Sequence, residues 1–145
     1  MDKLHEMIPL FNDIYEAAKV AGLDVETVIS EYAPGQFELT LKHQSNLLKS
    51  ADDIIRLKRI VRAQSRSHGI TACFMAKPME NVSGSGMHFH ISMYDKKGIN
   101  LFSENNKSKI NPNLLNAIGG LSQTMGESML VFAPHANSWR RLVLG

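Results

Sequence analysis

The spacing of apolar residues changes along the chain, and each spacing predicts a different element. Over the first 22 residues they recur every three or four positions, which predicts an amphipathic helix that stops at Gly22. Between Val25 and His43 the period falls to two on both sides of Pro34-Gly35. We expect two strands that are joined or bent at this Pro-Gly pair.

The next two segments predict a helix followed by a strand. Ser50 has the character of a helix N-cap, with Asp52 and Asp53 in the first turn, and His68 marks the end of the helix. Its inward positions would be Ile54, Leu57, Ile60 and Val61. The apolar run 70–77, ITACFMAK, then predicts a strand that Pro78 breaks.

In the stretch 84–95, GSGMHFHISMYD, the residues that follow the glycine-serine-glycine lead-in predict a second strand in this half of the chain. On a strand, alternate side chains point to opposite faces, so His88, His90 and Ser92 would share the polar one. A KKG turn follows, and the polar residues 103–113 predict a surface loop. A last apolar helix would run from Pro112 to Pro134, with internal glycines that suggest a bend or close packing.

The order of these elements predicts the fold class. Helix, two strands, helix, two strands and helix give an α+β fold with a mostly antiparallel sheet packed with helices. A chain of 145 residues is long enough for one ordinary domain with a real core.

Composition narrows the function classes. A hydrophobic content of 43% and a charged content of 21% are typical of a soluble globular protein, and a net charge of +2 is too small to indicate a nucleic-acid partner. No stretch approaches the roughly 20 apolar residues of a membrane span, and no secretory signal begins the chain. The single cysteine, Cys73, fits a reducing compartment. We therefore expect a cytoplasmic protein without a membrane partner.

Several residues could carry chemistry. Glu31 and Glu38 flank the Pro-Gly pair, and such acids are either ligands of a divalent cation or solvated strand residues. Arg140 and Arg141, after the last helix, suit an anion or serve as surface charge. The sequence contains no P-loop, GxGxxG, GxSxG or CxxC motif, so nucleophilic catalysis has no support. Of the reaction classes considered, metal-assisted chemistry is the one that these acids, histidines and arginines support.

Four ordered motifs resemble the glutamine synthetase family, over residues 10–145. They are EYAPGQFELTL, SADDIIRLKRIVRAQSRSHGITACFMAKP, SGSGMHFHIS and FAPHANSWRRLVLG. The resemblance implies an ATP-dependent ligase that phosphorylates the γ-carboxylate of glutamate and lets ammonia or an amine displace the phosphate. It implies Mg²⁺ or Mn²⁺ as cofactor, ATP as a substrate and a homo-oligomeric parent protein.

The same resemblance suggests roles for the polar residues. Glu31 and Glu38 match acidic ligands of one metal, and His88 matches a ligand of the metal near the nucleotide phosphates. His90 and Ser92 match residues that line the nucleotide site. Phosphoryl transfer requires charge neutralisation and positioning more than a nucleophilic side chain, which is consistent with these residue types.

At the positions that match the family's glutamate-binding site, some residues agree with the family pattern and others depart from it. Gly84 matches a glycine whose backbone meets glutamate, and Arg141 matches an arginine near glutamate and the transferring phosphate. Ser83 stands where classical members have asparagine, and Leu144 stands where they have proline. With the MAKP form of residues 75–78, these departures resemble the branch that joins glutamate to polyamines or other amines.

In this family, comparable residues form the middle of a longer subunit, between a β-grasp domain and a C-terminal part. We therefore expect residues 1–145 to be a partial catalytic domain that is inactive alone. The alternative is a non-catalytic folded remnant, or an interaction partner of a full-length paralogue.

Overall fold

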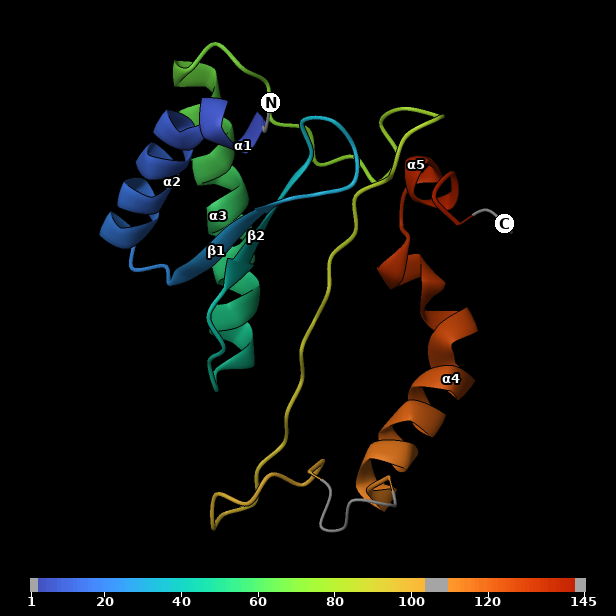
Figure 1. Ribbon diagram of the computed structural model, residues 1–145. Helices are drawn as coiled ribbons and strands as arrows, with labels where there is room; N and C mark the ends of the chain where they lie inside the picture. The colour runs from blue at the N-terminus through green and yellow to red at the C-terminus, as the bar shows by residue number, and fades with distance from the viewer. Residues whose placement is uncertain (1–2, 104–109, 143–145) are drawn as a thin grey trace. The chain divides into compact units, whose positions relative to one another are not determined.

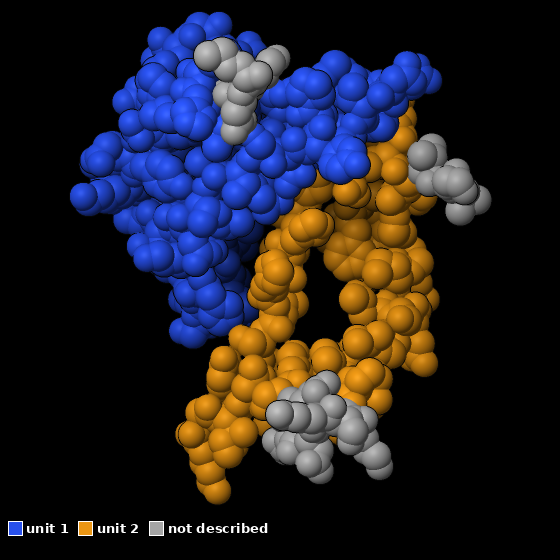
Figure 2. Space-filling model, viewed as in Figure 1, with its two compact units in different colours: residues 1–85 blue, residues 86–145 orange. Residues whose placement is uncertain are grey.

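The computed structural model describes residues 3–103 and 110–142 and divides the chain into two units. Unit 1 comprises residues 1–85 and unit 2 comprises residues 86–145 (Figure 2). The predicted loop 103–113 lies partly outside the described residues, which do not include 104–109.

Unit 1 opens with two consecutive helices, α1 (Lys3–Glu6) and α2 (Ile8–Val20), where the apolar spacing predicted a single helix (Figure 1). Pro9 lies in the first turn of α2, where its missing N–H costs nothing. Gly22 has a φ of 71°, and its N–H donates to the carbonyl of Lys19. The predicted glycine stop is therefore confirmed, since few other residues adopt this backbone conformation without strain.

The next element is an antiparallel hairpin of β1 (Val25–Ser30) and β2 (Phe37–Leu41). Its connection contains a tight turn in which the N–H of Gln36 donates to the carbonyl of Ala33 at 3.0 Å. Pro34 and Gly35 occupy the two central positions, and Gly35 has a φ of 74°. Proline followed by a glycine with positive φ is the signature of a type II turn. The predicted Pro-Gly bend is confirmed.

Helix α3 (Leu47–Ser67) begins earlier than predicted. Its N-cap is Asn46, whose side-chain oxygen accepts a hydrogen bond from the N–H of Lys49 at 3.0 Å. Ser50 is therefore an internal residue, and the prediction of a cap there was wrong. The apolar residues Leu47 and Leu48 are exposed, so the core-facing pattern of α3 could not reveal its first turn.

The core of unit 1 lies between α2 and α3, with the hairpin against it. Phe11 packs edge-on against Phe37 of β2, with ring centroids 5.0 Å apart. Ile14 is 1% exposed. The buried cluster contains Leu10, Phe11, Ile14, Leu57 and Val61.

The strands predicted at residues 70–77 and 87–94 are not formed within the described residues. Residues 70–75 run beside α3 instead, with Ala72 against the core and Phe74 beneath the charged groups of Lys58 and Arg62. Residues 87–93 follow an extended trace, yellow in Figure 1. Side-chain alternation predicts a strand, but a strand also needs a hydrogen-bonded neighbour. The described chain offers only the isolated bridge between Tyr94 and Asn100.

The rest of unit 2, as far as the structure describes it, contains a turn and two helices. The KKG turn is confirmed by Gly98, with a φ of 78°, and by hydrogen bonds from the N–H groups of Lys97 and Ile99 to the Asp95 carboxylate. Helix α4 (Pro112–Phe132) has Asn111 as its N-cap and follows the predicted range. A short helix, α5 (Ala136–Trp139), comes after Pro134.

Helices with a two-stranded antiparallel sheet confirm the α+β class. In the part of the chain that the structure describes, no helix combines the length and apolar character that crossing a bilayer requires.

Candidate functional site

The hairpin brings two of the predicted metal ligands onto one face. Ile29 pairs with Glu38, and the pairing extends one step past β1, because the N–H of Glu31 donates to the carbonyl of Gln36 at 2.9 Å. Glu31 thus lies opposite Gln36, and Gln36 precedes Glu38 by two residues along the chain. The side chains of Glu31 and Glu38 therefore point to the same face of the hairpin. Diagonal neighbours of this kind lie about 7–8 Å apart, and their Cβ atoms are somewhat closer. Their carboxylates can approach one cation.

A loop of unit 1 is attached to this hairpin turn. The side-chain amide of Gln36 donates to the carbonyl of Gly84 at 3.0 Å, and its oxygen accepts from the N–H of Ala33 at 3.1 Å. Gly84 is half-buried, whereas Ser83 beside it is exposed. The structure therefore brings Gly84 to the strand face that carries Glu31 and Glu38.

The loop before Gly84 has anchors of its own. The N–H of Ser85 donates to the carbonyl of Ala76 at 2.8 Å, and the ammonium of Lys77 donates to the carbonyl of Val82 at 2.6 Å. These bonds close residues 76–85 into a loop. Two hydrogen bonds therefore hold the last residues of this loop: Ser85 is bonded to Ala76, and Gly84 is bonded to Gln36 of the hairpin turn.

The predicted residues of unit 2 lie on the extended segment and after α5. His88 and His90 are exposed, and Ser92 is half-buried. Arg141 is also exposed, yet its guanidinium lies against the backbone of Gly86. A Cβ atom built on Gly86 would come within 2.9 Å of Arg141 Nη2, closer than real Cβ contacts. Gly86 thus leaves the space that this guanidinium fills.

The donor chemistry suits a hard divalent cation, but the ligand set is partial. Carboxylate oxygens are the preferred ligands of Mg²⁺ and Mn²⁺, and imidazole also binds Mn²⁺. Across residues 3–103 and 110–142, no three His, Cys, Asp or Glu side chains gather closely enough to hold a metal. Glu31 and Glu38 for one cation, and His88 for another, would therefore provide only part of each coordination shell.

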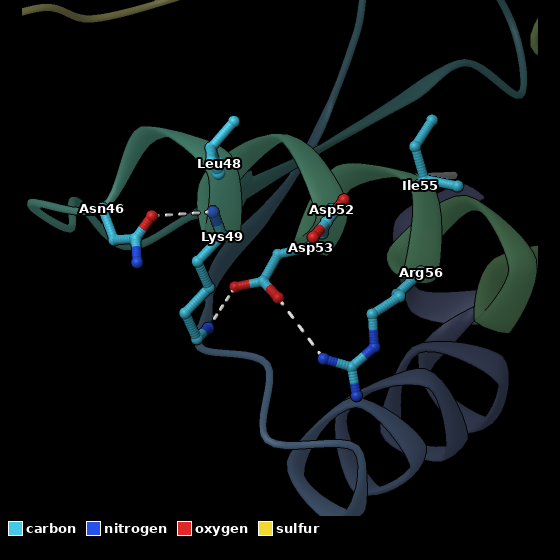
Figure 3. A pocket seen from close by; sticks show the side chains of 7 residues that line it. All are labelled: Asn46, Leu48, Lys49, Asp52, Asp53, Ile55 and Arg56. Atoms are coloured by element: carbon cyan, nitrogen blue, oxygen red, sulfur yellow. Dashed lines mark hydrogen bonds and ion pairs between the residues drawn. The ribbon is translucent and has the colours of Figure 1, made fainter.

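A pocket along the first turns of α3 contains none of the predicted site residues (Figure 3). At its centre is Asp53, which is 3% exposed. In Figure 3 the side chains of Lys49 and Arg56 converge on its carboxylate. The side-chain amide of Gln44, which the figure does not draw, also donates to it at 3.0 Å. The hydrogen bond from Lys49 is the main cause that lowers the pKa of Asp53 below its ordinary value of 3.8, and burial opposes it.

The ion pairs and hydrogen bonds around Asp53 have a structural role, which accounts for this pocket without a ligand. Arg56 also donates to the carbonyl of Ala21 at 2.6 Å, so the cluster joins α3 to the end of α2. Sequence reasoning missed it, although a lysine four residues before an aspartate and an arginine three residues after it are typical helix-surface ion pairs. No comparable signal pointed to Gln36, because its partner Gly84 is 48 positions away.

Comparisons with known proteins agree with the motifs. The model of the glutamine synthetase catalytic domain matches residues 1–145. The chain is 39% identical over 145 residues to gamma-glutamylputrescine synthetase PuuA of Escherichia coli K12, covering 100% of this chain and 30% of that protein. It is 34% identical over 134 residues to glutamine synthetase of Halobacterium salinarum, covering 92% of this chain and 29% of that protein.

Two further comparisons concern an amine ligase and a solved structure. Glutamate–isopropylamine ligase of a Pseudomonas species is 33% identical over 137 residues, covering 91% of this chain and 29% of that protein. The solved structure of apo GmaS without ligand superposes with a TM-score of 0.87 at 30% identity, covering 98% of this chain and 34% of the other. The chain thus spans about 30% of the length of the curated relatives it matches. It belongs to the glutamine synthetase family.

Proposed function

We propose that the protein containing this chain is an ATP-dependent ligase that joins the γ-carboxylate of glutamate to an amine. A γ-carboxylate oxygen attacks the γ-phosphorus of ATP, and the bond to the β,γ-bridging oxygen breaks, which yields γ-glutamyl phosphate and ADP. The amine nitrogen then attacks the acyl carbon, inorganic phosphate leaves, and the nitrogen loses a proton. Residues 1–145 would form part of the catalytic domain of a cytoplasmic homo-oligomer.

The observation that carries this proposal is the hairpin face. Two carboxylates of one face, Glu31 and Glu38, stand beside a loop whose backbone is tied to the same turn through Gln36. That arrangement suits a cation and an amino acid held next to each other. It is supported by relatives whose names describe glutamine synthetases and glutamate–amine ligases.

Three side chains would hold the divalent cations, Mg²⁺ or Mn²⁺. Glu31 and Glu38 supply oxygens to one, and His88 supplies a nitrogen to the other. When bound, the cations neutralise charge on the phosphates of ATP. Because no three His, Cys, Asp or Glu side chains of the described residues gather closely enough to hold a metal, the remaining ligands would come from elsewhere in the protein.

The other predicted residues would contact the organic substrates. His90 and Ser92 would line the nucleotide site, and Arg141 would stabilise negative charge on glutamate and the transferring phosphoryl group. The backbone of Gly84, with Ser83 beside it, would bind glutamate. An exposed guanidinium suits an anion, because its N–H donors form a planar fork that matches the oxygens of a carboxylate or a phosphate.

We further propose that the acceptor is an organic amine. The chain is 39% identical to the putrescine-using relative and 34% identical to the Halobacterium glutamine synthetase. The departures at Ser83 and Leu144 agree with this choice. A serine is shorter than the asparagine of classical members and presents one hydroxyl in place of an amide.

The test is an assay of ADP formation by the protein that contains this chain, at its natural length. ATP, Mg²⁺ and glutamate are supplied with either ammonia or putrescine, and the γ-glutamyl product is identified by mass spectrometry. We expect glutamate-dependent turnover with higher kcat/KM for putrescine. A preference for ammonia would overturn the choice of acceptor alone. Absence of any glutamate-dependent turnover would favour the non-catalytic alternative.

A matched pair of substitutions tests the role of the hairpin carboxylates. Glu38→Gln keeps the side-chain shape but removes the charge, and we expect turnover to fall by more than about a hundredfold, beyond the cost of losing a group that only supports a ligand. Glu26→Gln makes the same change at an exposed position of β1. Equal activities of the two variants would contradict the metal-binding role of Glu38.

A further inference from the structure

Within unit 1, the side chain of Gln36 joins two segments that lie 48 positions apart in the sequence. One segment is the turn of the hairpin that carries Glu31 and Glu38, and the other is the loop that ends at Gly84. The residue is half-buried, and both ends of its amide have partners.

The backbone of Gln36 is fixed before its side chain is considered. Its N–H donates to the carbonyl of Ala33 at 3.0 Å, and its own carbonyl accepts from the N–H of Glu31 at 2.9 Å. Both bonds belong to the closed turn around Pro34 and Gly35. The side chain therefore starts from a rigid base, which limits the directions in which it can extend.

The two partners also fix the orientation of the amide. The N–H of Ala33 needs an acceptor and the carbonyl of Gly84 needs a donor, so only one of the two flipped amide states satisfies both. Glutamate at this position could accept from Ala33 but could not donate to Gly84 when ionised. An apolar side chain could do neither. Glutamine is thus chemically suited to bridge these two groups.

We propose that Gln36 is a positioning residue that fixes the position of the Gly84 backbone relative to the metal-binding face of the hairpin. This inference rests on the proposed function, in which Gly84 binds glutamate and Glu31 and Glu38 bind a cation. The amide bridge fixes where the amino acid sits relative to the cation. Glu31 and Glu38 themselves are held by the strand pairing, so the bridge acts on glutamate binding and not on the cation.

The test compares Gln36→Met, Gln36→Glu and a control, Gln44→Met, in the protein at its natural length. Methionine removes both hydrogen bonds of the amide, and glutamate removes only the donor to Gly84. Gln44 is also half-buried and also donates one hydrogen bond, to Asp53, so the control matches the chemical change away from the hairpin turn. KM values for glutamate and ATP, Mn²⁺ affinity by electron paramagnetic resonance, and the melting temperature are measured for each.

We expect Gln36→Met to raise the KM for glutamate about five- to tenfold, the size expected from a lost hydrogen bond of roughly 1 kcal/mol. The KM for ATP and the affinity for Mn²⁺ should stay within about twofold of the wild type. Gln36→Glu should show the same rise for glutamate, and Gln44→Met should show none. The melting temperatures of the two methionine variants should be alike.

Three results would overturn the inference. The first is a Gln36→Met variant with the wild-type KM for glutamate. The second is a Gln36→Glu variant that behaves as the wild type, because the bond to Gly84 would then be dispensable. The third is an equal rise in every KM and in the control, which indicates a purely structural role. In all three the wild type still turns over, so the proposed function survives. A wild type without glutamate-dependent turnover overturns both.

Discussion

The two units of the chain bury their apolar residues to very different degrees. Unit 1 has a core between α2 and α3, whereas in the described part of unit 2 only Ala133 is buried. Helix α4 contains no buried residue, and the extended segment before it exposes Phe89 and Ile91. An apolar helix pattern therefore does not by itself place a helix in a core. The partner surface must also be present.

The largest test of this difference is a pair of large-to-small substitutions. Ile14→Ala removes a fully buried side chain of α2, and we expect it to lower the free energy of unfolding by about 3–4 kcal/mol. Ile118→Ala makes the same change on α4, where the side chain is 51% exposed, and should cost less than about 1 kcal/mol. Urea titrations followed by circular dichroism measure both. A loss above about 2 kcal/mol for Ile118→Ala would show that α4 is covered in solution.

A smaller effect is expected from the aspartates of the two units. Asp53→Asn in unit 1 removes a buried charge that Lys49 and Arg56 pair with, at a cost of about 1–2 kcal/mol at pH 7. Asp95→Asn in unit 2 should cost less than about 0.5 kcal/mol, because an asparagine oxygen can still accept from the turn N–H groups of Lys97 and Ile99.

The cost of Asp53→Asn should depend on pH. The pKa of Asp53 is lower in the folded chain than its ordinary value of 3.8, so the unfolded state binds more protons between the two values. The stabilisation is complete above about pH 5 and is lost as the pH falls below 3.8 through the folded pKa. Unfolding titrations at pH 7 and pH 3 should thus show a gap between wild type and variant that narrows on acidification. A constant gap would contradict the charge pairing.

Two glycine substitutions in unit 2 test the proposed role of Arg141, one at a glycine that the guanidinium contacts and one at a glycine with open space around it. Gly86→Ala should displace the guanidinium of Arg141 and lower kcat/KM for the proposed ligation roughly tenfold or more, because small misplacements of a group that stabilises the transition state are costly. Gly126→Ala is the matched control, since no described atom lies within 4 Å of a Cβ built there. Equal kcat/KM values for the two variants would argue against a role for the Gly86 contact.

The smallest effect compares one glycine from each unit. Gly119 lies inside α4 with nothing within 4 Å of a Cβ built on it, so Gly119→Ala should stabilise the helix by about 0.5–1 kcal/mol. Gly22, with its φ of 71°, ends α2, and Gly22→Ala should destabilise unit 1 by about 1 kcal/mol. Melting temperatures give both signs. Destabilisation by Gly119→Ala would restore the sequence-based expectation of close packing at this glycine.

The parts that sequence patterns predicted well are those decided by local chemistry. Pro34 and Gly35 favour one turn type, and Gly22 favours a helix stop, whatever surrounds them. The start of α3 was predicted four residues late, because the cap Asn46 precedes two leucines that avoid the core. The strands expected around Cys73 and His88 failed for a different reason: alternation describes one chain, while pairing needs a second.

The candidate site divides in the same way. Glu31 and Glu38 could be placed together from the Pro-Gly turn, since the turn determines their register. The bridge from Gln36 to Gly84 and the contact of Gly86 with Arg141 depend on distant segments meeting, and no spacing in the sequence encodes that. Motif resemblance named Gly84 and Arg141 but not Gln36 and Gly86, which contact them.

Trp139, the single tryptophan, ends α5 in unit 2 and is 54% exposed. Its fluorescence therefore reports on a region remote in sequence from α2 and α3, and from a ring already in contact with water before denaturation. An emission curve would change little while the core around Ile14 melts, whereas ellipticity would follow that melting. A small emission change would therefore not by itself indicate a folding intermediate. Only normalised curves that fail to coincide would indicate one, because a two-state chain gives the same normalised curve with every probe.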